Sequence, residues 1–136
     1  MSGADVFFDT NVVLYLLSAD LAKADRAEEL LAEGGTISVQ VLNECMSVAS
    51  RKLRMPWPEI REVLAQVRQV CSVEPLTVDT HERGMEVAQR YGLSVYDALI
   101  VSSALLAGCT MLYSEDMQDG QVIDGQLTIK NPFAVA

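Results

Sequence analysis

The stretch VFFDTN, residues 6–11, decides the fold that this sequence predicts. Val6 to Phe8 form a short apolar run typical of a buried strand, and a second apolar run begins a few residues later. Asp9 ends the first run, and Thr10 or Asn11 can act as the N-cap of a helix formed by the second. The chain is therefore expected to open with a strand followed directly by a helix, with an acid at their junction.

The remaining sequence repeats this alternation of short apolar runs and segments with helical spacing. Further helices are expected over residues 20–33, 39–55, 59–71, 81–92 and 98–107, and further strands over residues 36–38, 73–78 and 110–114. An Asp-Gly pair within residues 122–127 predicts a hairpin, and Asp79 with Glu82 forms a predicted capping box. Strands alternating with helices favour a three-layer α/β/α domain with a mostly parallel central sheet.

The length and composition fit one compact domain spanning residues 1–136, since half of the 136 residues are hydrophobic. The only long uncharged run, residues 98–114, is too short to cross a membrane, and the first residues lack the positive charge of a secretory signal. Cys45, Cys71 and Cys109 lie in apolar stretches, which predicts buried thiols rather than disulfides or a zinc site. A cytoplasmic protein without a membrane partner is expected.

Four acids from separate parts of the sequence could meet at one edge of the predicted sheet. Asp9 and Asp116 end two strand candidates, and ligand sites gather at the carboxyl ends of parallel strands. Glu44 lies at the border of the apolar stripe of its helix, and Asp97 lies in the first turn of the most apolar helix. Carboxylates held together repel one another unless a cation is bound, and oxygen ligands without His or Cys suit Mg²⁺ or Mn²⁺. Such a site is suited to a phosphate substrate.

Three of these acids also have a simpler interpretation. Asp9 can be a helix cap, Asp97 can complete a capping box with Ser94, and Glu44 can be a solvated residue at a helix edge. Independent caps, however, have no reason to recur in this order on elements whose ends converge. The joint pattern therefore favours a shared site.

The motifs that carry these acids resemble the ordered acidic motifs of PIN-domain ribonucleases. They are FFDTN at residues 7–11, LNE at residues 42–44, SVYDALIVSSAL at residues 94–105 and LYSED at residues 112–116. The resemblance covers almost the whole chain. As a single compact chain of this size, the sequence most resembles the VapC-like toxins of bacterial toxin-antitoxin pairs. It implies a three-layer PIN-like fold, cleavage of RNA phosphodiester bonds, a homodimer and a cognate antitoxin protein.

The resemblance also implies the site residues. Mg²⁺ or Mn²⁺ would be bound by Asp9, Glu44, Asp97 and Asp116, with Thr10, Asn11 and Ser114 as supporting polar groups. The last motif departs from the commonest form of the family, because no aromatic residue follows its acid closely. Glu115 and Asp119 therefore rival Asp116 as the fourth ligand. Asp116 is preferred because it directly ends the predicted strand, and Asp119 is interpreted as an outer supporting acid.

Positive charge is scarce in this chain, whose formal net charge is −9. A polyphosphate partner would need a metal ion, a second protein or a local basic cluster, and the only concentrated cluster is Arg51, Lys52 and Arg54. This cluster is either a solvated helix face or a contact for RNA phosphates. His81 is expected to be exposed at a helix start, and Trp57 is interpreted as a packing residue at a helix junction.

Two other functions remain open from the sequence. The first is a PIN-like module that binds RNA or a protein partner without cutting. The second is a receiver-type phosphoacceptor domain, which also combines a parallel sheet, clustered acids and Mg²⁺. A receiver would need adjacent acids after the first strand and a lysine near the end of a late strand, and neither FFDTN nor LYSED provides them.

Overall fold

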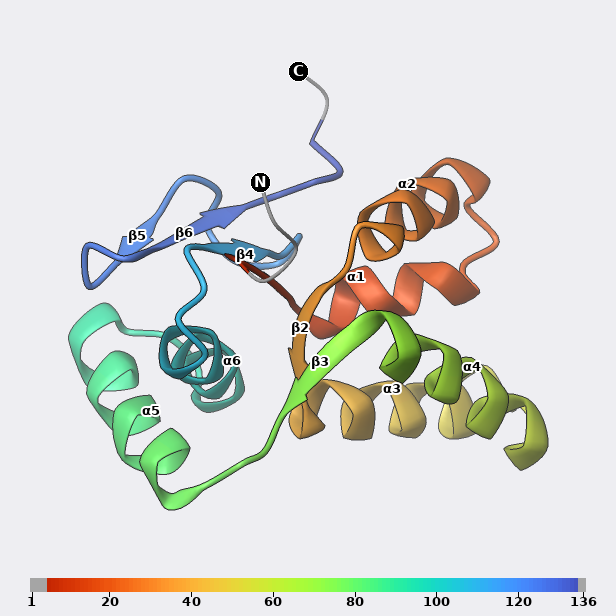
Figure 1. Cartoon of the computed structure of the whole chain (residues 1–136), viewed down its shortest axis with the longest axis horizontal. Helices are drawn as coiled ribbons and strands as arrows, with labels where there is room; N and C mark the ends of the chain where they lie inside the picture. The colour runs from red at the N-terminus through yellow and green to blue at the C-terminus, as the bar shows by residue number, and fades with distance from the viewer. Residues whose placement is uncertain (1–4, 135–136) are drawn as a thin grey trace.

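The computed structural model describes residues 5–134 and is shown in Figure 1. In chain order its elements are β1 (Val6–Phe8), α1 (Thr10–Leu14), the 3-10 helix η2 (Tyr15–Leu17), α2 (Leu21–Ala32), β2 (Gly35–Ser38), α3 (Val39–Arg51), α4 (Trp57–Val70), β3 (Cys71–Glu74), α5 (Val78–Tyr91), α6 (Val95–Leu106), β4 (Met111–Tyr113), β5 (Val122–Ile123) and β6 (Leu127–Lys130). The predicted alternation of strands and helices is confirmed.

The strands form one sheet in the order β3-β2-β1-β4-β6-β5. Every neighbouring pair is parallel except β5 and β6, which form the predicted hairpin around Asp124 and Gly125. Three residues, 124–126, connect these strands, and Asp124 and Gly125 among them have positive φ angles, 52° and 64°, which Asp and Gly tolerate better than most residues. Figure 1 shows α5 and α6 on one side of the sheet and α1 to α4 on the other. The predicted three-layer α/β/α fold is therefore confirmed.

The hydrophobic core lies between the sheet and the two helix layers. Phe7, Ile37 and Leu112 on the neighbouring strands β1, β2 and β4 have no exposed surface, as expected of strands covered on both faces. Helix α6 is buried along most of its length because it is apolar on nearly all sides. Gly84 allows α5 to pack closely on α6, since a Cβ atom there would lie 2.7 Å from the Leu99 side chain. This packing fixes α6 against α5.

Two predicted boundaries near strand ends are wrong. Asp9 itself caps α1, because its Oδ1 accepts a hydrogen bond of 2.7 Å from the Thr10 amide. Thr10 is thus the first residue of the helix, and neither it nor Asn11 is the cap. Strand β3 ends just before Pro75 instead of covering residues 73–78, because proline has no amide hydrogen to donate to the sheet.

Two predicted helix boundaries are also wrong. The capping box of α5 is formed by Thr77 and Thr80, whose hydroxyls each accept a hydrogen bond from the other residue's amide, and not by Asp79 and Glu82. Helix α3 stops short of its predicted end, and Arg54 beyond it has a φ angle of 52°, outside the helical region. Helix α4 begins soon after this turn.

Exposure tests several predictions about single residues. The three cysteines are buried, and His81 is exposed on α5, as predicted. Trp57 is 55% exposed, so its interpretation as a packing residue is wrong. Within residues 5–134, no helix has both the length and the apolar character needed to cross a bilayer.

Candidate functional site

A pocket of about 240 Å³ opens at the carboxyl edge of the sheet and contains all four predicted acids. Its lining residues come from α1, α3, α6 and the segments after β1 and β4: Asp9, Thr10, Asn11, Leu14, Gln40, Glu44, Val48, Tyr96, Asp97, Ile100 and Asp116. None of these residues is Lys, Arg or His. The pocket therefore concentrates negative charge that no lining side chain neutralises.

The topology of the sheet brings the first and last motifs together. Strands β1 and β4 are parallel neighbours, and Phe8 pairs with Tyr113. The Asp9 amide continues this pairing with a hydrogen bond of 3.0 Å to the Tyr113 carbonyl. Residues that follow the two strands consequently lie side by side, and Ser114 donates a hydrogen bond of 2.8 Å to Oδ2 of Asp9.

Asp9 is the most buried of the four acids, with 6% of its surface exposed. In addition to Ser114 Oγ and the Thr10 amide, Asn11 Nδ2 donates to its Oδ2 at 3.3 Å. Burial raises the pKa of Asp9 to about 6, the Ser114 and Thr10 hydrogen bonds oppose the rise, and the charges of Asp97 and Glu44 add to it. An ionised Asp9 is thus costly unless a cation is near.

Two side chains hold the Glu44 carboxylate, and one of them, Gln40, is not among the residues predicted from the sequence. Thr10 Oγ1 donates to Glu44 Oε1 at 2.7 Å, and Gln40 Nε2 donates to the same oxygen at 3.3 Å. Gln40 Nε2 also donates to the Tyr96 carbonyl at 3.1 Å, which links α3 to the first turn of α6. Gln40 lies four residues before Glu44, so helical spacing alone would have placed both on one face.

Asp97 serves as both a helix-start residue and a pocket residue. Its amide donates to Ser94 Oγ at 3.3 Å, as the capping interpretation predicts. Its carboxylate lines the pocket. Burial raises the pKa of Asp97, hydrogen bonding of its side chain with the Ser94 side chain opposes this rise, and the charges of Asp116 and Glu44 add to it. The local interpretation and the site interpretation are therefore compatible.

Of the three rival acids after β4, Asp116 alone lines the pocket. It does not end the strand directly, since β4 stops at Tyr113. Asn11 Nδ2 donates to Asp116 Oδ2 at 3.1 Å, while Asn11 Oδ1 accepts the Glu115 amide at 3.2 Å. Asp119 instead accepts a hydrogen bond of 2.7 Å from the Asn131 amide.

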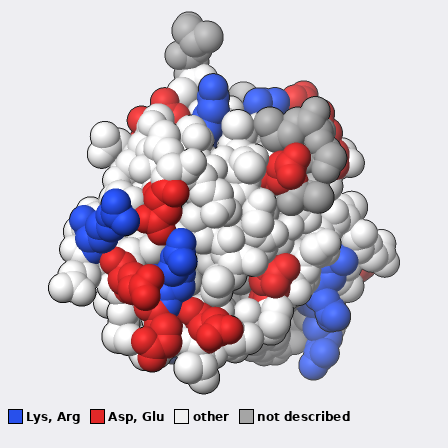
Figure 2. All heavy atoms as spheres, turned by 60° about the vertical axis from the view of Figure 1, so that its left-hand side comes forward, with Lys and Arg blue, Asp and Glu red and all other residues white. Residues whose placement is uncertain are grey.

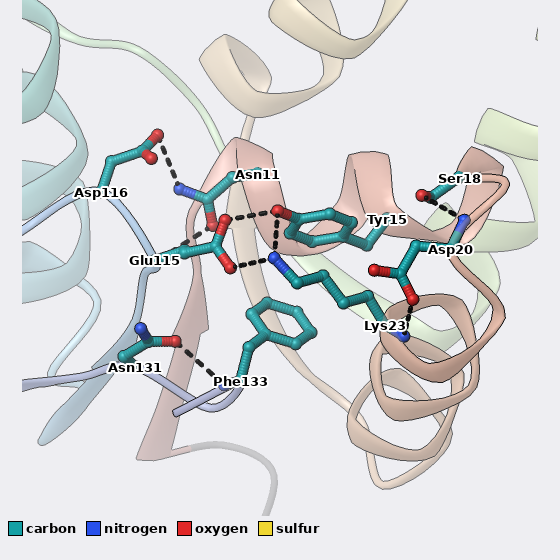
Figure 3. A network of polar contacts seen from close by, with 9 residues as sticks. All are labelled: Asn11, Tyr15, Ser18, Asp20, Lys23, Glu115, Asp116, Asn131 and Phe133. Carbon is teal, nitrogen blue, oxygen red and sulfur yellow. Dashed lines mark hydrogen bonds and ion pairs between the residues drawn. The ribbon is translucent and has the colours of Figure 1, made fainter. Parts of the chain in front are cut away.

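Figure 3 shows the polar network that connects Glu115, through Asn11, with the pocket residue Asp116. The Glu115 carboxylate forms an ion pair of 2.8 Å with Lys23 Nζ and accepts a hydrogen bond from the Tyr15 hydroxyl. Lys23 also lies over the Tyr15 ring, and Phe133 packs edge-on against the same ring. These contacts hold the segment after β4 against η2 and α2, and they engage the Glu115 carboxylate outside the pocket.

The predicted basic cluster lies outside the pocket as well. Arg51, Lys52 and Arg54 are all exposed. Arg51 follows Glu44 and Val48 along the same face of α3 at helical spacing, which places it farther along the wall that these two residues contribute.

The donor chemistry of the pocket fits a hydrated divalent cation. Among residues 5–134, no three His, Cys, Asp or Glu side chains are already arranged closely enough to bind one metal ion. Mg²⁺ keeps several of its waters and usually binds protein through one or two carboxylates, so closely gathered ligands are not required. Four carboxylates without nitrogen or sulfur donors suit Mg²⁺ or Mn²⁺ better than zinc.

Residues 6–118 match the family described as PIN domain. Comparison with curated proteins gives no match. Three solved structures with a similar fold are a toxin-antitoxin complex from Klebsiella pneumoniae (TM-score 0.72, 22% identity, 96% of this chain and 99% of that chain covered), VapC20 from Mycobacterium tuberculosis (0.65, 26%, 82% and 89%) and VapBC2 from Rickettsia felis (0.66, 18%, 93% and 97%). VapC20 is described as a toxin that cleaves the sarcin-ricin loop, and VapBC2 is bound to a DNA fragment from its promoter.

Proposed function

The chain belongs to the PIN domain family, and on this premise we propose that it is an endoribonuclease that uses Mg²⁺ or Mn²⁺ bound by Asp9, Glu44, Asp97 and Asp116. The family match confirms the resemblance seen in the sequence motifs. The observation that carries the proposal is the pocket itself, in which acids from four separate segments meet without a lining Lys or Arg.

The residues around the acids have supporting roles in this proposal. Thr10 and Gln40 hold the Glu44 carboxylate, Ser114 holds Asp9, and Asn11 connects Asp9 with Asp116. When bound, a divalent cation supplies positive charge for the phosphate and lowers the pKa of the attacking water. Fixed hydrogen bonds keep the acids in place before substrate arrives, which reduces the reorganisation needed for the reaction.

The biological role that fits this site is the toxin of a type II toxin-antitoxin module. Support comes from the fold shared with VapC20, a toxin that is 26% identical and cleaves the sarcin-ricin loop, and with chains from toxin-antitoxin complexes. A cognate antitoxin protein and a homodimer are part of this proposal. Its cytoplasmic location and its single-domain organisation stay predictions.

Exposed basic residues provide a contact for the negatively charged substrate. Arg51, Lys52 and Arg54 lie at the end of α3, and Arg51 extends the face of that helix that carries Glu44. Contact between this cluster and RNA phosphates would offset part of the repulsion from an acidic protein. Asp119 is proposed only as an outer acid that holds the loop after β4 through Asn131.

The receiver-type alternative has no support from the fold. Receiver domains have the strand order 2-1-3-4-5, whereas this sheet has the order β3-β2-β1-β4-β6-β5. A PIN-like module that binds RNA or a partner without cutting stays an alternative, and the cleavage assay decides between it and the nuclease.

The test is incubation of purified protein with structured and unstructured RNAs in the presence of Mg²⁺ or Mn²⁺. Wild-type protein should cut at least one RNA, and Asp9→Asn or Asp97→Asn should lose the activity. Asp25→Asn is the matched control, because it makes the same chemical change at an exposed position of α2. Undiminished cleavage by Asp97→Asn would overturn the assignment of the site.

A further inference from the structure

Helices α3 and α4 form a second hollow of about 490 Å³ on their outer surface. It is lined by Leu42, Asn43, Met46, Trp57, Ile60, Arg61, Leu64, Ala65 and Arg68, and is called the α3–α4 groove below. Its charged lining residues are both arginines. The groove therefore differs in sign from the acidic pocket, although both are bounded by α3.

The exposed side of α4 carries an aromatic residue and two guanidinium groups in one line. Trp57, Arg61 and Arg68 are spaced by four and seven residues, so they share one face of the helix. At 1.5 Å per residue this line is about 16 Å long. A helical step of about 100° per residue places Glu59 and Glu62 on the other side of α4, away from Trp57.

The charge of the chain is strongly segregated around this groove. Residues 39–70 contain five Lys or Arg and three Asp or Glu, whereas the remaining sequence contains five Lys or Arg and sixteen Asp or Glu. Figure 2 brings forward the left-hand side of Figure 1, where α5 lies, and at its left edge acidic side chains lie beside the basic ones, so positive charge is not in excess there. An acidic protein can bind a polyanion only where positive charge is locally in excess, and the segment of residues 39–70, which contains α3 and α4, is such a place.

We infer that the α3–α4 groove binds a single-stranded segment of RNA, with one base stacked on Trp57 and phosphates paired with Arg61 and Arg68. Sites for single strands combine aromatic platforms with a positive groove, and this groove has both. The inference rests on the proposed function, because it takes the bound RNA to be part of the nuclease substrate. A purely apolar protein partner would leave two arginines facing its surface without counter-charges.

The position of the groove relative to the acids is compatible with one continuous strand. Helix α3 separates the two sites, and an α-helix is about 10 Å across. Arg51 lies on the Glu44 face of α3, and Lys52 and Arg54 lie in the turn that leads to Trp57. A strand leaving the acidic pocket can therefore pass this basic turn and reach the groove.

Trp57 is the only tryptophan of the chain, so its fluorescence reports on the groove directly. The probe is a 12-nucleotide oligouridylate, titrated in a chelator so that cleavage does not compete with binding. Its binding should quench Trp57 emission, and Trp57→Leu should weaken affinity by about 5- to 150-fold, the range expected for loss of one stacked base. Arg61→Gln and Arg68→Gln should each reduce the slope of log affinity against log salt by about 0.7.

Arg90→Gln is the matched control, since it removes the same charge from an arginine on α5 whose side chain is 72% exposed. Unchanged emission on adding RNA, or equal salt slopes for Arg61→Gln, Arg68→Gln and Arg90→Gln, would overturn the inference. Emission that depends on protein concentration without RNA would also overturn it, by showing that a second copy covers the groove. RNA binding at Trp57 by a protein that never cleaves RNA would support the groove and reject the nuclease proposal.

Discussion

Replacing Asp9 with Asn tests whether the pocket penalises an ionised carboxylate that has no cation beside it. Burial raises the pKa of Asp9 from its usual 3.8 to about 6, the Ser114 and Thr10 hydrogen bonds oppose the rise, and the charges of Asp97 and Glu44 add to it. In the metal-free protein, the folded state therefore holds the Asp9 proton more tightly than the unfolded state does.

The sign and size of the effect follow from this difference. Between pH 3.8 and about 6, the unfolded chain loses a proton that the folded chain keeps, so the free energy of unfolding falls as the pH rises through this window. One pKa unit corresponds to about 1.4 kcal/mol, so the loss from Asp9 is about 3 kcal/mol at pH 7. Asn does not titrate, so the free energy of unfolding of Asp9→Asn should rise relative to that of wild type as the pH increases from 3.8 to 7, by about 3 kcal/mol in total.

Urea denaturation between about pH 4 and pH 8, in the presence of a chelator, measures this difference directly. All other titrating groups are common to both proteins, so the difference between the two curves isolates Asp9. Adding Mg²⁺ at one hundred times its dissociation constant should then stabilise wild type by about 2.7 kcal/mol and the variant by less. Parallel curves of unfolding free energy against pH, with equal Mg²⁺ effects on the two proteins, would refute the claim that ionised Asp9 destabilises the folded state unless a cation is bound.

Three further changes test other parts of the structure. Asp124→Ala should lower the free energy of unfolding by about 2–4 kcal/mol, as measured by urea denaturation. The substitution removes hydrogen bonds of 2.8 Å from both Arg83 and Tyr91, and it places Ala at a position with a positive φ angle. Asp124→Asn should lower the free energy of unfolding by less than half as much. Equal stabilities of all three proteins would contradict this. Gln40→Met should weaken Mn²⁺ binding by about 10-fold or more in calorimetry, since it removes the donor to Glu44, and unchanged affinity would rule out a positioning role for Gln40. Below pH 6, where Asp9 takes up a proton, the cleavage rate at subsaturating Mg²⁺ should fall about tenfold per pH unit, and a flat rate from pH 7 to pH 5 would argue against a role for ionised Asp9.

Two of the four acids that line the pocket are marked by their local sequence. Asp9 stops a buried apolar run, and Asp97 begins an unusually apolar helix. Parallel strands deliver their carboxyl ends to one edge, so the meeting of Asp9 with the residues after β4 follows from the alternation of strands and helices.

Contacts between segments that are far apart in the sequence could not be predicted in the same way. Lys23 and Glu115 are far apart in sequence and meet only because α2 packs beside the segment after β4. The strand order and the pairing of β4 with β6 likewise depend on tertiary packing. The end of β3, by contrast, is predictable from Pro75, which has no amide hydrogen to donate to the sheet, so the predicted extension to residue 78 is wrong.

A crystal of the protein soaked in Mn²⁺ tests the proposed metal site most directly. The anomalous difference map should show a peak in the acidic pocket, within bonding distance of at least two of the four carboxylates of Asp9, Glu44, Asp97 and Asp116. A map at saturating Mn²⁺ with strong peaks elsewhere and none in this pocket would contradict the account.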